Sequence, residues 1–178
     1  MIKKTEKKIK AAFLRETVQS STKEALDLYS KSRFGEMKDS VVLYSLVEAM
    51  YLVQEKKMNV YDPKNKKMTE KVFLSEVRIV ESNFNVRYIV FKDLRSRGYI
   101  VKTALKFGAD FRVYDRGVKP GDDHAKWIVY PVFESESFTW YEWAAKNRVS
   151  HSTRKRLLLA IVDAEHDVSY WEANWIKP

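Results

Sequence analysis

Residues 107–115 read Phe-Gly-Ala-Asp-Phe-Arg-Val-Tyr-Asp, and this stretch predicts a β-strand in the second half of the chain. Apolar and polar side chains alternate along it, and consecutive side chains of a strand project to opposite faces of a sheet. Phe111 and Val113 therefore share the face that packs on a core. Arg112 and Tyr114 are expected on the opposite, polar face, so Tyr114 should point away from the core.

Four further segments around this strand are rich in aliphatic and aromatic residues and predict strands of their own. They are residues 99–105, 127–133, 157–163 and 168–176. A helix precedes them, because apolar residues from Tyr88 to Leu94 recur at helical spacing and Gly98 is a typical left-handed cap after a helix. This order of elements predicts a mixed sheet flanked by helices.

The first part of the chain predicts a small α+β domain. A strand is expected at residues 9–18, and Ser21 or Thr22 can cap a helix over residues 23–31. A second strand runs into the polar turn of residues 62–66, and Thr69 starts another helix.

A longer helix is expected between these elements, with Asp39 or Ser40 as its cap. Its apolar residues recur every three or four positions, as on one face of a helix. They are Leu43, Leu46, Val47, Met50 and Tyr51. The polar stretch 81–83 then separates residues 1–84, an N-terminal α+β domain, from residues 85–178, a C-terminal domain that contains the mixed sheet.

The composition of the chain excludes several classes of protein. With 45% hydrophobic residues and only 5 Gly and 4 Pro among 178 residues, a disordered or collagen-like chain is excluded. The absence of cysteine excludes disulfide scaffolds, thiolate metal sites and cysteine nucleophiles, and it fits a reducing cytoplasm. No apolar run is long enough to span a membrane, so we expect a cytoplasmic protein with no membrane partner.

The charge of the chain favours a polyanionic partner. There are 33 Lys and Arg against 24 Asp and Glu, which leaves a net charge of +9. Most of the arginines follow Phe84, and the flat guanidinium fork binds phosphate oxygens in pairs and stacks on bases. The second domain is therefore the better candidate for contacting nucleic acid.

Three residues of this domain carry side chains suited to proton transfer or charge stabilisation. Tyr114 has cationic neighbours, and His124 stands between a loop and a predicted strand. Lys155 lies within a run of three cations before an apolar strand. Each also has an ordinary explanation: a tyrosine covering a sheet, a surface histidine beside Asp122 and Asp123, and a solvated basic turn.

A phenol, an imidazole and an ammonium can together cleave RNA without a metal ion. One group removes the proton of the 2′-hydroxyl, one protonates the departing 5′-oxygen, and one neutralises the crowded phosphorane. The products are a 2′,3′-cyclic phosphate and a 5′-hydroxyl. The three histidines of the chain show no metal-ligand spacing, and we expect no metal and no cofactor.

Several spaced motifs of the sequence resemble the archaeal tRNA-splicing endonucleases. They are residues 88–99, residues 106–114, His124, and residues 151–155 with 160–163; the string 45–49 also resembles the N-terminal domain of that family. The resemblance implies that Tyr114 is the general base, His124 the general acid and Lys155 the charge-stabilising lysine. It implies as substrate the bulge–helix–bulge of precursor tRNA.

The same resemblance implies that Arg148 pins a flipped-out base of the RNA. The arginines beside two of the catalytic positions, Arg112 and Arg154, are expected to contact the RNA as well.

Cutting at two intron boundaries needs two active sites, and the resemblance implies a homotetramer. In that class, carboxy-terminal strands pair and an acidic loop inserts into a neighbouring subunit. The matching features here are Trp171 and Trp175 on the last strand and the acidic turn of Asp163, Glu165 and Asp167. The alternatives are a non-catalytic RNA-binding subunit of a splicing endonuclease and a metal-dependent nuclease that holds Mg²⁺ on carboxylates such as Asp122 and Asp123.

Overall fold

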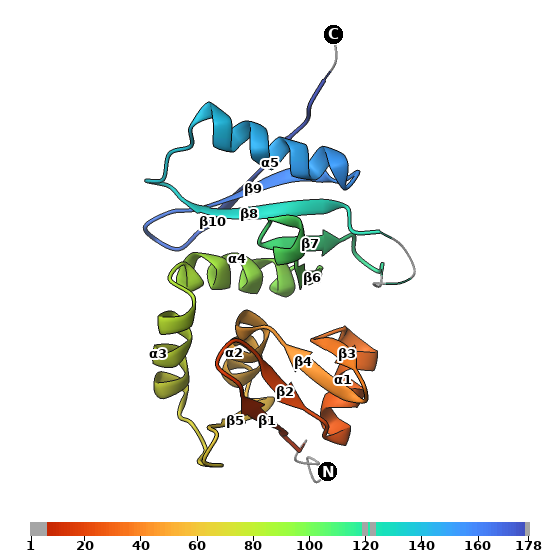
Figure 1. The fold of residues 1–178 in the computed structure, drawn as a ribbon, viewed down its shortest axis with the longest axis vertical. Helices are drawn as coiled ribbons and strands as arrows, with labels where there is room; N and C mark the ends of the chain where they lie inside the picture. Colours follow the sequence, from red (N-terminus) through yellow and green to blue (C-terminus); the bar gives the residue numbers. More distant parts are fainter. Residues whose placement is uncertain (1–6, 119–120, 122–123, 177–178) are drawn as a thin grey trace. The chain divides into compact units, whose positions relative to one another are not determined.

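The computed structural model describes residues 7–118, 121 and 124–176. It divides into two compact units, Met1–Phe84 and Asn85–Pro178. Each unit contains a five-stranded sheet that combines antiparallel pairs with one parallel pair (Figure 1). The expected mixed α+β class is therefore confirmed. Among the described residues, no helix is long and apolar enough to cross a membrane.

The first unit has a sheet in the strand order β3-β4-β2-β1-β5. Its strands are β1 Ile9–Phe13, β2 Val18–Ser20, β3 Glu36–Lys38, β4 Val41–Tyr44 and β5 Met58–Tyr61. Its helices are α1 Lys23–Ser32, α2 Leu46–Gln54 and α3 Glu70–Val80. Thr22 and Thr69 cap α1 and α3 through their side-chain oxygens, which confirms both predicted helix starts.

The strand expected at residues 9–18 is two strands, and that prediction was wrong. The chain reverses between β1 and β2, where the Leu14 amide donates to the Thr17 carbonyl at 2.8 Å and Arg15 adopts a positive φ of 66°. The turn contains no Gly, Pro or Asn, so the apolar pattern runs through it without a visible break.

The long helix expected from Asp39 or Ser40 begins later than predicted. Asp39 and Ser40 both have positive φ angles, 48° and 65°, and form the two-residue turn between β3 and β4. The β-branched residues that follow pair with both neighbouring strands. Ser45 is the true cap of α2, and its side chain forms a reciprocal capping box with Glu48.

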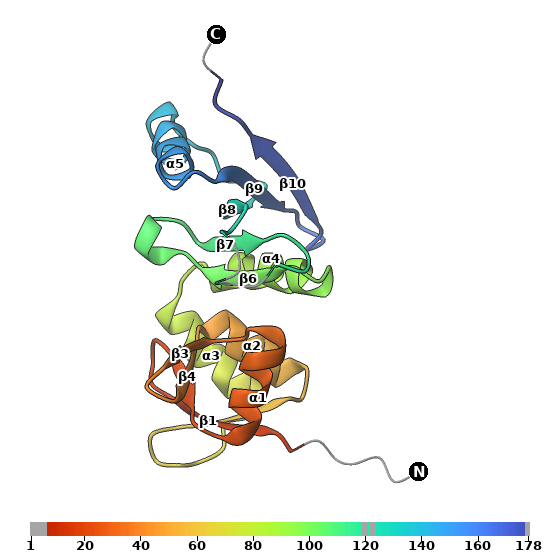
Figure 2. The same ribbon diagram turned by 90° about the vertical axis from the view of Figure 1, so that its right-hand side faces the viewer.

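The second unit has a sheet in the order β10-β9-β8-β7-β6, with β10 and β6 at its edges (Figures 1 and 2). Its strands are β6 Ile100–Thr103, β7 Phe111–Tyr114, β8 Trp127–Phe133, β9 Arg156–Val162 and β10 Val168–Ala173. Its helices are α4 Phe84–Ser96, the short 3₁₀ helix η1 Leu105–Phe107 and α5 Trp140–Ser152. The predicted mixed sheet is confirmed.

Helices α4 and α5 lie on opposite faces of this sheet (Figure 1). Phe91 of α4 contacts Phe111 with ring centroids 6.0 Å apart. Trp143 and Val149 of α5 instead pack on a buried cluster that includes Ile128 and Leu157. The sheet is therefore covered by a helix on both faces, whereas the alternating pattern of residues 107–115 predicted one core face and one polar face.

The predicted strand bounds hold best where no turn lies inside the apolar run. β8 spans the predicted residues, whereas residues 105–107 form η1 and β7 begins only at Phe111. Gly98 has a positive φ of 87°, and the amides of Gly98 and Tyr99 bond back to the last turn of α4. This confirms the predicted glycine cap.

Replacing the buried Glu48 tests the packing of the first unit. Its carboxylate accepts from the Gly35 amide at 2.9 Å, the Ser45 amide at 3.1 Å and the Ser45 hydroxyl at 2.9 Å. Glu48→Ala should lower the free energy of unfolding by about 2–3 kcal/mol in urea unfolding of the full chain, because buried donors lose their acceptor. The exposed Glu76→Ala is the control, and equal effects of the two changes would contradict this account.

Candidate active site

The strand register brings three segments of the second unit to one end of its sheet. Val113 pairs with Trp127, which pairs with Arg156. The Lys126 amide donates to the Val113 carbonyl at 2.9 Å, and the Arg156 amide donates to the Lys126 carbonyl at 3.0 Å. The last residue of β7 and the residues just before β8 and β9 therefore lie at the same end.

Tyr114 is the last residue of β7 and is only 5% exposed. The expectation that it points away from the core was wrong, because α5 covers the face that the alternating pattern marks as polar. Arg112 lies on this face, and its cross-strand partner Ile128 belongs to the cluster beneath α5. Tyr114, two residues beyond Arg112, projects to the same side.

The end of α5 positions Lys155. The Lys155 amide bonds to the Ser150 carbonyl at 2.8 Å and the Arg154 amide to the His151 carbonyl at 3.0 Å, which together form a Schellman motif. Residues 150–152 therefore form the end of α5. Lys155 is half-buried, and its Nζ donates to the Thr153 carbonyl at 2.8 Å.

His124 is exposed and lies three residues before β8. Residues 124–126 belong to no helix or strand, so His124 lies on a loop that leads into β8 at the same end of the sheet as Tyr114 and Lys155. Asp122 and Asp123, considered above as partners of His124 and as metal ligands, lie outside the described residues.

The three arginines expected to contact RNA differ in their surroundings. Arg148 is exposed on α5, about one turn before the helix ends. Arg154 is exposed with a positive φ of 54°, and Arg112 is half-buried on β7. Arg112 pairs across the sheet with Lys102, a lysine only 4% exposed. We did not predict Lys102, although its place in a strand beside Val101 would have put it on the face of Arg112.

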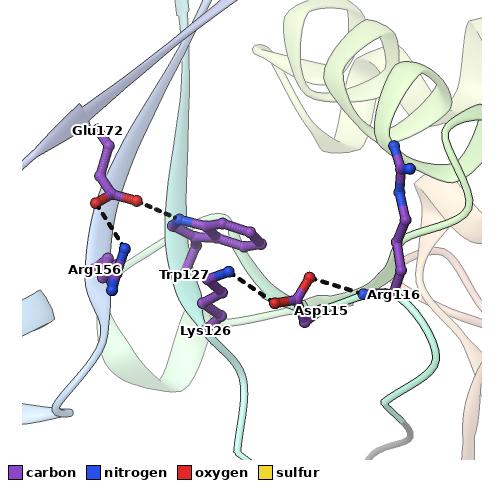
Figure 3. Close-up of polar contacts among 6 residues, drawn as sticks. All are labelled: Asp115, Arg116, Lys126, Trp127, Arg156 and Glu172. Carbon is purple, nitrogen blue, oxygen red and sulfur yellow. Dashed lines mark hydrogen bonds and ion pairs between the residues drawn. The ribbon is translucent and has the colours of Figure 1, made fainter.

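A chain of polar contacts crosses the sheet at this end (Figure 3). Lys126 Nζ lies 2.7 Å from Asp115 Oδ2, and this hydrogen bond lowers the pKa of Asp115. The Trp127 indole donates to Glu172 at 2.8 Å, which lowers the pKa of Glu172, and Arg156 lies 3.1 Å from its other oxygen. Both carboxylates therefore stay charged at neutral pH.

A buried ion pair anchors the start of β7 to α4. Arg87 Nε lies 2.8 Å from Asp110 Oδ1, and the guanidinium sits 5.3 Å from the centre of the Phe111 ring. Burial raises the pKa of Asp110 against the opposing effect of Arg87. Breaking such a pair would leave an unpaired buried charge, so the strand that ends in Tyr114 is held firmly at its start.

No group of three histidine or carboxylate side chains that could hold a metal ion occurs within residues 7–118, 121 and 124–176. A cavity of about 720 Å³ lies in the first unit, lined by residues that include Phe13, Met68 and Val72.

The features expected to support assembly lie along the edge strand and its turn. Trp171 on β10 is 64% exposed and Trp175, which follows the strand, is 65% exposed. Asp163, Glu165 and Asp167 lie in the turn between β9 and β10, where the Asp167 amide donates to Asp163 Oδ1 at 2.8 Å. The tryptophans are therefore not core residues of this chain.

Both units match a known family. Residues 9–74 match the model described as tRNA intron endonuclease, N-terminal domain, and residues 84–170 match the model described as tRNA intron endonuclease, catalytic C-terminal domain. The chain belongs to the tRNA intron endonuclease family. This confirms the resemblance inferred from the sequence and the expected enzyme class, an endonuclease of tRNA introns.

Curated members of the tRNA intron endonuclease family match along most of the chain. A tRNA-splicing endonuclease of Nanoarchaeum equitans is 46% identical over 139 residues, 75% of this chain and 88% of that protein. One of Thermococcus onnurineus is 41% identical over 150 residues, 84% of this chain and 85% of that protein. One of Methanothermobacter thermautotrophicus is 36% identical over 158 residues, 89% of this chain and 91% of that protein.

Arg154 of this tRNA intron endonuclease allows two effects to be tested separately: the cost of a positive φ in the backbone, and the contribution of the side chain to RNA binding. A left-handed conformation costs a residue other than glycine about 1 kcal/mol. Arg154→Gly should therefore raise the free energy of unfolding by up to about that amount in urea, yet weaken binding of precursor RNA. Arg154→Ala, which keeps the strain, should weaken binding without the gain in stability. A glycine variant that is less stable than the wild type would show that the arginine side chain stabilises the fold.

Proposed function

We propose that this chain cleaves precursor tRNA at both intron boundaries within a bulge–helix–bulge, by attack of the ribose 2′-hydroxyl and without a metal ion. The observation that carries the proposal is the strand register. It supports a site in which Tyr114, His124 and Lys155 act together, since the segments that hold them lie at one end of the second sheet.

Each of the three groups has one step in the proposed reaction. Tyr114 takes the proton of the 2′-hydroxyl, whose oxygen attacks the phosphorus. The bond from phosphorus to the 5′-oxygen breaks, and His124 gives that oxygen a proton. Lys155 neutralises the charge of the phosphorane, and its partial burial favours this role because water screens the charge less. The products are a 2′,3′-cyclic phosphate and a 5′-hydroxyl.

Three arginines are proposed to hold the RNA around this site. Arg148 is exposed on α5, the helix on the same face of the sheet as Tyr114, which suits stacking on an unpaired base. Arg154 directly precedes Lys155 and Arg112 lies on the strand of Tyr114, so both are placed to contact phosphates near the cut.

We propose that the active enzyme is a homotetramer. Two cuts need two sites, and one chain supplies one. An exposed edge strand bearing large apolar side chains tends to pair with another chain, and β10 with Trp171 is such an edge. The acidic turn of Asp163, Glu165 and Asp167 is proposed to enter a neighbouring subunit that presents cations.

The substrate and the chemistry can be tested together with chelator and a modified RNA. In EDTA, the chain should cut a bulge–helix–bulge precursor at both boundaries. Mass spectrometry of the products should show 2′,3′-cyclic phosphate and 5′-hydroxyl ends. A single 2′-deoxyribose at one boundary should stop that cut alone, because the nucleophile is missing. Cutting that needs Mg²⁺ would favour a metal-dependent nuclease, and an inert wild-type chain that binds the RNA would favour a non-catalytic subunit.

Two substitutions test the roles of the acid and the lysine. His124→Ala should slow single-turnover cleavage by about a hundredfold or more while RNA affinity changes by less than about threefold. Lys155→Ala should likewise slow cleavage far more than it weakens binding, because the charge it meets develops in the transition state. The exposed His151→Ala, in the same unit, is the control and should cleave at close to the wild-type rate. Equal loss of rate and affinity in His124→Ala would contradict its role as the acid.

A further inference from the structure

Arg116 lies two residues beyond Tyr114 and is exposed at the same end of the sheet. Its guanidinium carbon sits 4.9 Å from the centre of the Tyr99 ring. The Tyr99 ring meets the Trp127 ring edge to face, with centroids 5.9 Å apart at an angle of 85°. The arginine is therefore supported by a pair of aromatic rings at the end of the sheet where Tyr114 lies, with Trp127 on the face that it shares with its partner Val113.

This aromatic pair is itself fixed in place. Trp127 Nε1 donates to Glu172 Oε2 at 2.8 Å, and Lys126 Nζ lies 4.4 Å from the centre of the Trp127 ring (Figure 3). Glu172 belongs to β10 and is also bonded to Arg156. The support beneath Arg116 thus reaches across the sheet through the Tyr99–Trp127–Glu172 contacts, and the Trp127 ring cannot turn without breaking the indole hydrogen bond.

Arg97 gives a direct comparison within the same unit. It too is exposed, and its guanidinium lies 5.8 Å from the centre of the Tyr170 ring. Its Nε, however, lies 2.7 Å from Asp93 Oδ2, and this bond raises the pKa of Arg97. Arg97 is therefore a cation whose charge is already matched by a carboxylate.

Arg116 forms no ion pair with a carboxylate of residues 7–118, 121 and 124–176, although its charge helps to lower the pKa of Asp115. The neighbouring Asp115 uses one oxygen for Lys126 Nζ at 2.7 Å and the other for the backbone amide of Arg116 at 3.0 Å. Stacking on Tyr99 covers one face of the guanidinium and leaves its N–H groups, which lie in the plane, able to donate outward.

We propose that Arg116 binds a backbone phosphate of the RNA next to the phosphate that is cut. A guanidinium fork matches two phosphate oxygens, and an arginine already held on an aromatic ring loses less conformational entropy when it binds. The contact is to the phosphate backbone and is independent of base sequence. The assignment rests on the proposed function, since it places Arg116 at the edge of the site formed by Tyr114, His124 and Lys155.

The experiment compares Arg116→Ala with Arg97→Ala in binding to precursor RNA as the salt concentration is varied. The RNA carries 2′-deoxyribose at both boundaries, so that binding is measured without cutting. Arg116→Ala should lower the affinity for the RNA about tenfold. The salt slope, which is the slope of log affinity against log salt concentration, should become smaller by about one. The affinity of Arg97→Ala should change by less than about twofold. Arg116→Lys should keep the slope but recover only part of the affinity, because it keeps the charge and loses the fork.

Tyr99→Leu tests the support separately from the charge. It removes the ring beneath Arg116 and should lower affinity with the salt slope unchanged. Circular dichroism and unfolding of each variant check that the fold is retained.

Two failures are distinguishable. If the wild-type chain cuts the all-ribose precursor but Arg116→Ala and Arg97→Ala bind the 2′-deoxy precursor with the same affinity, the assignment of Arg116 is wrong and the proposed function stands. If the wild-type chain neither binds nor cuts the precursor, the proposed function fails and the assignment fails with it.

Discussion

The parallel pairing of β8 with β9 is the constraint on which the candidate site depends. All other pairs of the second sheet are antiparallel, and an antiparallel partner would enter from the opposite end. Because the pair is parallel, the residues before both strands lie at one end, and β7 brings its last residue there. With an antiparallel β9, Lys155 would lie a strand length, ~20 Å, away from Tyr114.

Helix α5 makes this pairing possible, and capping hydrogen bonds hold both of its ends. Parallel neighbours need a crossover, and α5 returns the chain from the end of β8 to the start of β9. A capping box of Thr139 and Glu142 holds its start, and the Schellman motif before Lys155 holds its end. Between them, Ser150 is the buried residue of the helix. The backbone of Lys155 is thus tied to the last turn of α5, and a shift of Lys155 would unwind that turn.

The helix caps could be predicted from the sequence, because a cap depends on one residue and its nearest neighbours in the chain. Thr22 and Thr69 start helices and Gly98 ends one, as expected, because a hydroxyl acceptor or a positive φ is a property of one residue. Turns made by Arg15 and by Asp39 with Ser40 were missed, since neither contains glycine. The burial of Tyr114 could not be read from alternation either, because a helix distant in sequence covers that face. Tyr114, His124 and Lys155 were picked out by residue type and context, but their individual roles came from the family resemblance, and nothing in the residue pattern indicated that their segments meet.

Strand β9 separates the two proposed functional regions of this unit, the cleavage site with Lys155 and the acidic turn of the subunit interface. Lys155 precedes its first residue and the acidic turn follows its last, so seven residues in extended conformation keep them ~20 Å apart. The acidic turn of a chain therefore cannot contribute to the site of that same chain. If it acts on catalysis at all, it must do so at the site of a second copy, and the exposed Trp171 on the adjoining edge strand offers apolar surface for that contact. Activity that falls with dilution of the enzyme would then reflect loss of assembly while each chain keeps its own fold.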